Sequence, residues 1–172
     1  MDSYPPGLSE APAWQRSAAD ELVNAATHGL GFVLALVGAL VMAAGVRAQA
    51  DPWLALGCGL YLASLVAVYA MSTLSHSASS PRWKTLFRRL DQGCIYVLIV
   101  ATYTPLSLAY LRGGFWWSIL GAMWAAALIG FVAKVFFAHR TEAVSLVSYL
   151  ALGWMPALGV PELVRAVPVG VL

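Results

Sequence analysis

Charged residues are scarce in this chain, and their scarcity indicates its class. Of 172 residues, 10% are Asp, Glu, Lys or Arg, whereas 60% are hydrophobic. A soluble domain carries about a quarter charged residues, and it needs enough polar surface to cover its core. The composition therefore predicts a protein whose surface largely faces lipid. The small net charge of +2, with clustered basic residues, gives no indication of a nucleic-acid-binding groove.

The chain also lacks cysteine motifs and a recognisable secretory leader. Its two cysteines, Cys58 and Cys94, lie in apolar runs, without the CxxC or Cys/His spacing of a metal or redox site. The first twenty residues are polar and Pro-containing, without the basic and apolar regions of a signal peptide. We therefore expect buried structural thiols, a cytoplasmic tail over residues 1–20, and a transmembrane domain over residues 21–172.

Long apolar segments are abundant. A bilayer core of about 30 Å needs roughly 20 apolar helical residues, and a chain in lipid must satisfy its own backbone hydrogen bonds. The sequence therefore predicts an all-α, polytopic transmembrane bundle, in which the third helix is open to an earlier start near Asp91. Three glycines seven residues apart indicate a close-packing face on the first helix: Gly31, Gly38 and Gly45. The five expected spans cover about 22–46, 52–75, 94–111, 115–138 and 143–160.

The basic residues predict the orientation, because cytoplasmic segments carry an excess of Lys and Arg. Three of the ten fall on the side opposite the N-terminus: Arg47, Arg112 and Arg165. The other seven fall on the N-terminal side: Arg16, Arg82, Lys84, Arg88, Arg89, Lys134 and Arg140. We therefore expect a cytoplasmic N-terminus and a cytoplasmic connection between the second and third helices.

Polar residues within or beside the spans gather at this same end. Ionisable groups inside a membrane are costly, so each is a candidate site residue. Together they indicate a polar, water-accessible cavity that opens toward the cytoplasm. They stand at the start of the first span, the end of the second and the start of the third: Glu21, Asn24, Thr27, His28; Tyr69, Ser72, His76; and Asp91.

Each of these residues has a structural interpretation as well as a functional one. Glu21 suits the first turn of a helix as a polar cap, and His76 fits a metal ligand, a general base or an interfacial cap. Asp91 fits an N-cap or a local ion pair, a partner that orients a histidine, or a base for metal-bound water. Lys134 fits a side chain that snorkels to the headgroups, and His139 fits a loop.

Several stretches of the sequence resemble the haemolysin III family, the bacterial branch of the progestin and adiponectin receptor superfamily. They occur in the family's order and together cover roughly residues 20 to 160. The stretches are ELVNAATHGLG (21–31), YAMSTLSH (69–76), FRRLDQGCIY (87–96), ATYTP (101–105) and GWMP (153–156).

The resemblance implies a seven-helix protein of the bacterial inner membrane with a cytoplasmic N-terminus. The superfamily holds zinc near the cytoplasmic side with a histidine of helix two and an HxxxH pair of helix seven, and it includes alkaline ceramidases. Carried over, the resemblance implies His76 as a metal ligand, with Ser72 and Asp91 completing the polar, catalytic site. It thus implies a zinc-dependent hydrolase that cleaves a lipid amide or ester.

This chain departs from the family pattern in having no HxxxH. Its histidines are His28, His76 and His139, of which only His76 matches a ligand position. Zinc takes three protein ligands in a catalytic site and four in a structural one, and whether His28 substitutes is open. We expect a shortened version of the architecture, without helices six and seven.

The alternatives to a hydrolase are a non-enzymatic receptor-like, scaffold or membrane-perturbing (cytolytic) protein, and an inactive fragment. A pore is less favoured, because the polar residues gather at one end rather than along a whole helix face. The expected partners are membrane lipids and further copies of the chain.

Overall fold

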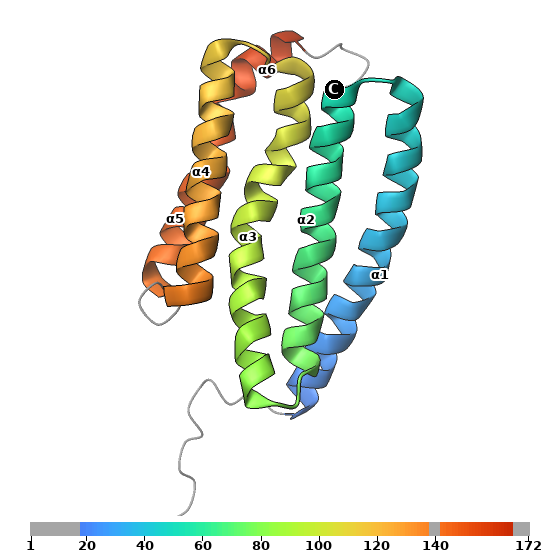
Figure 1. Ribbon diagram of the computed structural model, residues 1–172, viewed down its shortest axis with the longest axis vertical. Coiled ribbons are helices and arrows are strands. Elements are labelled where there is room, and N and C mark those ends of the chain that lie inside the picture. The colour runs from blue at the N-terminus through green and yellow to red at the C-terminus, as the bar shows by residue number, and fades with distance from the viewer. Residues whose placement is uncertain (1–17, 138–141, 167–172) are drawn as a thin grey trace, which may run out of the picture.

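A computed structural model describes residues 18–137 and 142–166, and all its regular elements there are helical (Figure 1). The expected all-α bundle is thus confirmed. His139 lies outside the described residues. The elements are α1 Ala18–Gln49, α2 Pro52–Ser77, α3 Pro81–Tyr110, α4 Gly114–Phe137, α5 Glu142–Trp154, the 3₁₀ helix η2 Met155–Gly159 and α6 Val160–Ala166.

Proline begins two of the helices. Pro52 and Pro81 occupy the first turns of α2 and α3, where the missing N–H costs nothing. Asp51 caps α2, because its Oδ1 accepts the backbone N–H groups of Trp53 at 2.9 Å and Leu54 at 3.3 Å. A short, proline-started connection therefore sets each helix antiparallel to the one before it.

The third helix begins at Pro81, well before the expected start near Asp91 or position 94. The basic cluster of residues 82–89 consequently lies on the first turns of α3 rather than in a loop. Lys, Arg and Leu are good helix formers, and a helix can continue beyond the apolar layer that it spans. Apolar length alone therefore predicts this boundary too late in the chain.

Four helices of the described residues, α1 to α4, are long and apolar enough to cross a membrane. The fifth region differs from a single continuous α-helix over 143–160. The 13 residues of α5 rise about 20 Å, and then Pro156, which lacks an N–H, falls within η2. Figure 1 shows α5 lying behind α4 and α6 at the end where α3 finishes, so the divided path still follows the bundle's length.

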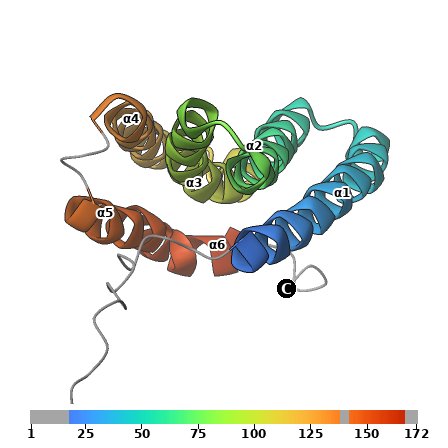
Figure 2. The same cartoon turned by 90° about the horizontal axis from the view of Figure 1, so that it is seen from below.

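The third helix occupies the centre of the bundle, between α2 and α4, with α5 packed against α3 and α4. Seen along the helices in Figure 2, α1 to α4 form an arc, and α5 and α6 lie below this arc in the view. The main core is built where α3, α4 and α5 meet. Its buried side chains are Tyr96, Val100, Tyr103, Leu108, Leu111, Leu120, Met123, Ala127 and Leu152.

Glycine allows the closest helix contact, but not along the whole expected stripe. A Cβ on Gly57 would lie 2.6 Å from the Cα of Pro105, so α2 and α3 cross in near backbone contact. Gly31 likewise admits the ring of Tyr69 from α2, whereas nothing lies within 4 Å of a Cβ on Gly38 or Gly45. Of the predicted close-packing face, only its first glycine is used within the described residues.

Candidate functional site

The polar residues predicted from the sequence come from three helix ends that lie together. The start of α1, the end of α2 and the start of α3 meet at the lower end of the bundle in Figure 1. Only three residues, 78–80, separate α2 from α3, so the last turn of α2 lies beside the first turns of α3. This arrangement makes one polar site from segments far apart in the sequence.

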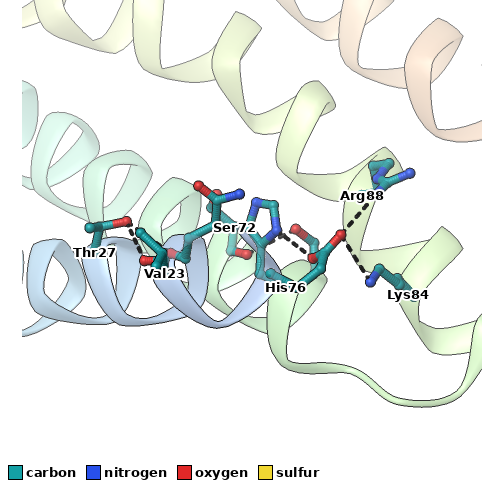
Figure 3. A network of polar contacts seen from close by, with 9 residues as sticks. Val23, Thr27, Ser72, His76, Lys84 and Arg88 are labelled. Atoms are coloured by element: carbon teal, nitrogen blue, oxygen red, sulfur yellow. Dashed lines mark hydrogen bonds and ion pairs between the residues drawn. The ribbon is translucent and has the colours of Figure 1, made fainter. Parts of the chain in front are cut away.

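Glu21 is the hub of this site. One oxygen of its carboxylate, Oε2, lies 2.8 Å from Nδ1 of His76. The other, Oε1, lies 3.1 Å from Nζ of Lys84 and 3.9 Å from a guanidinium nitrogen of Arg88. Figure 3 shows His76, Lys84 and Arg88 converging on this one carboxylate from α2 and α3. The side chains of Glu21 and His76 are only 15% and 9% exposed, so the contact between them is largely shielded from solvent, whereas Lys84 and Arg88 are 30% and 46% exposed.

The contact with Glu21 determines which nitrogen of His76 is available. An ionised carboxylate only accepts hydrogen bonds, so Nδ1 carries the proton that it shares with Glu21. The other nitrogen, Nε2, is then left to bind something else. A histidine held in this way by a carboxylate is the usual arrangement of a metal-ligating or proton-transferring imidazole.

Two further predicted residues complete a second pair beside the first. Ser72 is buried at 4% exposure, and its side chain lies close enough to the carboxyl group of Asp91 on α3 to influence it. The carboxylate of Asp91 also lies within electrostatic reach of His28, His76 and Arg88. The carboxyl group that contacts His76 is thus that of Glu21, and the carboxyl group of Asp91 lies near Ser72 instead.

His28 belongs to the same cluster. Its ring stacks on that of His76, with 5.5 Å between the centroids and 5° between the planes, and Tyr69 lies at 6.4 Å from His28. Thr27 does not take part, because its hydroxyl donates to the carbonyl of Val23 on its own helix at 2.9 Å, as Figure 3 shows. The structure therefore brings together five predicted residues: Glu21, His28, Ser72, His76 and Asp91.

The sequence analysis missed the partners of Glu21. The sequence indicates Lys84 and Arg88 only as part of a cytoplasmic basic cluster, and Glu21 as a candidate site residue or a polar cap. Spacing of four residues along one helix face would have grouped Lys84 with Arg88, yet nothing local connects them to residue 21. A further prediction was wrong at Lys134, whose side chain is buried at 4% exposure instead of reaching to the headgroups.

The described residues do not by themselves fit a zinc ion. Zinc takes at least three protein ligands, and within 18–137 and 142–166 no group of three or more His, Cys, Asp or Glu side chains is placed to hold a metal. His76 offers one suitable nitrogen. Cys58 and Cys94 are free thiols. Cys58 is buried as expected, whereas Cys94 is only half-buried and lies on α3 one turn after Asp91.

The opposite end of the bundle carries an ion pair of a different kind. Oδ2 of Asp51 lies 2.8 Å from the guanidinium of Arg112, both side chains being about one-third to one-half exposed. Partial desolvation acts to raise the pKa of Asp51, but the N–H groups of Trp53 and Leu54 and the charge of Arg112 outweigh it and lower the pKa. This pair ties the α1–α2 connection to the end of α3.

A comparison with known protein families agrees with the motifs of the sequence. A family model described as haemolysin-III related matches residues 16–171. The chain belongs to this family. The haemolysin III resemblance seen in the sequence motifs is thereby confirmed, and with it a multi-pass protein of a membrane.

Individual relatives of the haemolysin III family show how far the likeness extends. The chain is 33% identical over 144 residues to "Hemolysin-3" of Bacillus cereus, covering 84% of this chain and 66% of the relative. The figures for the "Hemolysin-3 homolog" of Bacillus subtilis (strain 168) are 33%, 84% and 68%. The human "Monocyte to macrophage differentiation factor" is 28% identical over 156 residues, which cover 61% of it. The chain thus spans about two thirds of the length of the curated relatives that it matches, and no solved structure matches it.

Proposed function

We propose that this haemolysin III-related protein acts on membrane lipids at the polar site of α1, α2 and α3, by hydrolysing an amide or ester bond. The observation that carries the proposal is the Glu21–His76 contact of 2.8 Å beside the Ser72–Asp91 pair. It supplies an oriented imidazole and a carboxylate within one shielded cluster, which is what general acid–base chemistry requires. The lipid would enter from within the bilayer.

In this proposal the four side chains have separate roles. Asp91 accepts a proton from water as that water attacks the lipid carbonyl carbon, and returns this proton to the leaving amine or alcohol as the C–N or C–O bond breaks. Ser72, buried close to Asp91, holds the carboxylate and the water in place. Glu21 holds His76 through Nδ1–H, so that the lone pair of Nε2 is directed to the site, where it accepts a hydrogen bond from the attacking water.

In this proposal His76 is a ligand of zinc, and zinc has no other role. The family resemblance implies it, and the Glu21 contact on Nδ1 is the outer support that metal-bound histidines commonly have. One histidine is too few for a stable site, so a bound zinc would need ligands beyond those that the described residues offer.

Lipid and metal analysis of the same preparations tests the proposal. Membranes containing the wild type, His76→Ala or Asp91→Asn would be compared by lipid mass spectrometry, with Glu162→Gln as a matched control far from the site. We expect a lipid cleavage product with the wild type and the control, and none with the two site variants. Identical lipid profiles in all four would contradict the hydrolase proposal. About one zinc per purified chain, lost in His76→Ala, would support the metal ligand.

A non-enzymatic function is the second candidate, and one observation favours it: the described residues lack a complete set of metal ligands. A receptor-like, scaffold or membrane-perturbing protein needs none, and the names of the Bacillus relatives point to lysis. Leakage of dye from liposomes by the purified protein, unchanged in His76→Ala, would favour a membrane-perturbing function. No leakage and no lipid product would leave a scaffold or an inactive chain.

A further inference from the structure

A second cluster of charged and aromatic side chains lies at the end of the bundle opposite the candidate site. It joins the start of α2, the end of α3 and the first turn of α4, at the upper end in Figure 1. Oδ2 of Asp51 lies 2.8 Å from the guanidinium of Arg112, and the rings of Trp53 and Trp117 lie 5.3 Å apart between centroids. We call these four residues the Asp51 cluster.

Hydrogen bonds to the backbone hold the Asp51 cluster in place. Nε1 of Trp117 donates to the carbonyl oxygen of Arg112 at 3.0 Å, and Nε of Arg112 donates to the carbonyl oxygen of Leu108 at 2.7 Å. Oδ1 of Asp51 accepts the two N–H groups that begin α2. A ligand of this cluster therefore meets side chains that are already ordered, which lowers the entropic cost of binding.

The Asp51 cluster is accessible and keeps unused binding capacity. The side chains of Asp51 and Arg112 are 34% and 45% exposed, and Trp53 and Trp117 are 41% and 38% exposed. Among the described residues, Oδ2 of Asp51 accepts a hydrogen bond only from Arg112, although a carboxylate oxygen has two lone pairs. Arg112 donates to described residues only through Nε and one terminal nitrogen. A cation can therefore approach Asp51 while an anion approaches Arg112.

The Asp51 cluster stands at the depth of the lipid headgroups. The 26 residues of α2 rise about 39 Å, which exceeds a hydrocarbon core of about 30 Å. Polar side chains mark both ends of this helix, with Asp51 at its start and His76 in its last turn, so each end extends beyond the core. Tryptophan is enriched at this depth. A lipid headgroup is thus the ligand that this part of the surface meets in a membrane.

We propose that the Asp51 cluster binds a zwitterionic phospholipid that carries a primary ammonium group. The headgroup lies antiparallel to the ion pair. Its phosphate accepts hydrogen bonds from the guanidinium of Arg112, and its ammonium donates to Oδ2 of Asp51. The rings of Trp53 and Trp117, inclined at 73° to each other, offer aromatic faces beside the ammonium.

This arrangement distinguishes between headgroups by their charge and their hydrogen bonds. An anionic headgroup has no cation to place beside Asp51. A quaternary ammonium contacts the aromatic rings but has no N–H to donate to the carboxylate. Binding at the Asp51 cluster is independent of any chemistry at His76, which lies at the other end of α2.

Native mass spectrometry of the full chain, purified and delipidated in detergent, tests this binding. The probe is an equimolar mixture of phosphatidylethanolamine, phosphatidylcholine and phosphatidylglycerol with identical acyl chains. We expect the wild type to retain phosphatidylethanolamine preferentially. Asp51→Asn should bind this lipid about tenfold more weakly, since a hydrogen bond to a charged group contributes about that factor. Asparagine caps a helix as well as aspartate does, and Arg112 keeps its charge, so phosphatidylglycerol should bind this variant at least as well.

Two further variants separate the Asp51 cluster from general charge at this end of the bundle. Trp53→Leu should weaken binding of phosphatidylethanolamine and phosphatidylcholine but not of phosphatidylglycerol, because only the first two carry a cation. Glu162→Gln is the matched control, since Glu162 pairs with Arg165 on α6 at the same end, and it should keep the wild-type preference. Equal retention of the three lipids by the wild type, or an unchanged preference in Asp51→Asn, would overturn the proposal. So would an equal loss of preference in Glu162→Gln.

Discussion

At the scale of single residues, the site depends on the carboxylate of Glu21, which contacts three basic side chains. Glu21 contacts His76 through one oxygen and Lys84 and Arg88 through the other. Hydrogen bonds between ionised groups are stronger than neutral ones, and the shielding of this cluster limits the screening that weakens exposed pairs. Glu21 therefore both orients the imidazole and compensates the positive charge at the start of α3.

Replacing that carboxylate by an amide tests its role. Glu21→Gln keeps the shape of the side chain but leaves Lys84 and Arg88 facing His76 without a negative charge. We expect it to lower the free energy of unfolding by about 1–3 kcal/mol, the usual cost of removing one partner of a partly buried charged contact. Equilibrium unfolding in mixed micelles measures this change.

A second acidic residue provides the control. Glu162 pairs with Arg165 at 3.4 Å, but the two side chains are 50% and 76% exposed. Exposed pairs contribute about 0–1 kcal/mol, so Glu162→Gln should have little effect. An equal loss of stability in the two variants would show that Glu21 matters only as a surface charge.

At the scale of elements, α2 and α3 are held together at both ends. At one end, the two helices cross with Gly57 against the backbone of Thr104 and Pro105. At the other end, where Ser72, His76 and Asp91 lie, only residues 78–80 separate the two helices, which brings the end of α2 against the basic first turns of α3.

Adding one methyl group at this crossing should be costly. In Gly57→Ala the new Cβ would lie 2.6 Å from the Cα of Pro105, too near without separating the helices. We expect a loss of about 1–3 kcal/mol, as for other overpacked interiors, measured by the same unfolding method. Gly59 has nothing within 4 Å of a built Cβ, so Gly59→Ala should be neutral or stabilising by up to about 1 kcal/mol. Equal stability of the two variants would contradict this close packing.

At the scale of the whole molecule, the question is which membrane face carries the site. Both polar layers lie at the ends of the bundle: the Glu21–His76 cluster at one and the Asp51–Arg112 pair at the other. The excess of Lys and Arg on the side of the first predicts that it faces the cytoplasm. This orientation, and an inner-membrane location, are predictions that labelling can check.

Single cysteines at the two helix connections test the orientation. In a Cys58→Ala/Cys94→Ala background, Ala50→Cys marks the α1–α2 connection and Ser79→Cys marks the α2–α3 connection. Applied to intact cells, a membrane-impermeant maleimide should label Ala50→Cys at once and Ser79→Cys only after permeabilisation. The reverse pattern would place the polar site outside the cytoplasm.

Much of the fold follows from the sequence because lipid imposes simple rules. Four of the predicted apolar segments correspond to α1 to α4, and Pro52 begins α2 as the sequence predicts. The start of α3 and the division of the fifth region did not follow. Apolar length does not reveal that a helix continues into charged residues at Pro81, nor that Pro156 falls in a 3₁₀ turn.

The candidate site likewise has a part that the sequence predicts and a part that it does not. The sequence alone determined that this is a helical membrane protein of the haemolysin III family, and that His28, Ser72, His76 and Asp91 share one end of the bundle. Composition and spacing along each helix are sufficient for that. Only the tertiary structure decided that Glu21, rather than Asp91, holds His76 across 55 residues of chain, and that Lys84 and Arg88 join it. The rotation and close crossing of packed helices select these partners, and neither property is encoded in any single segment.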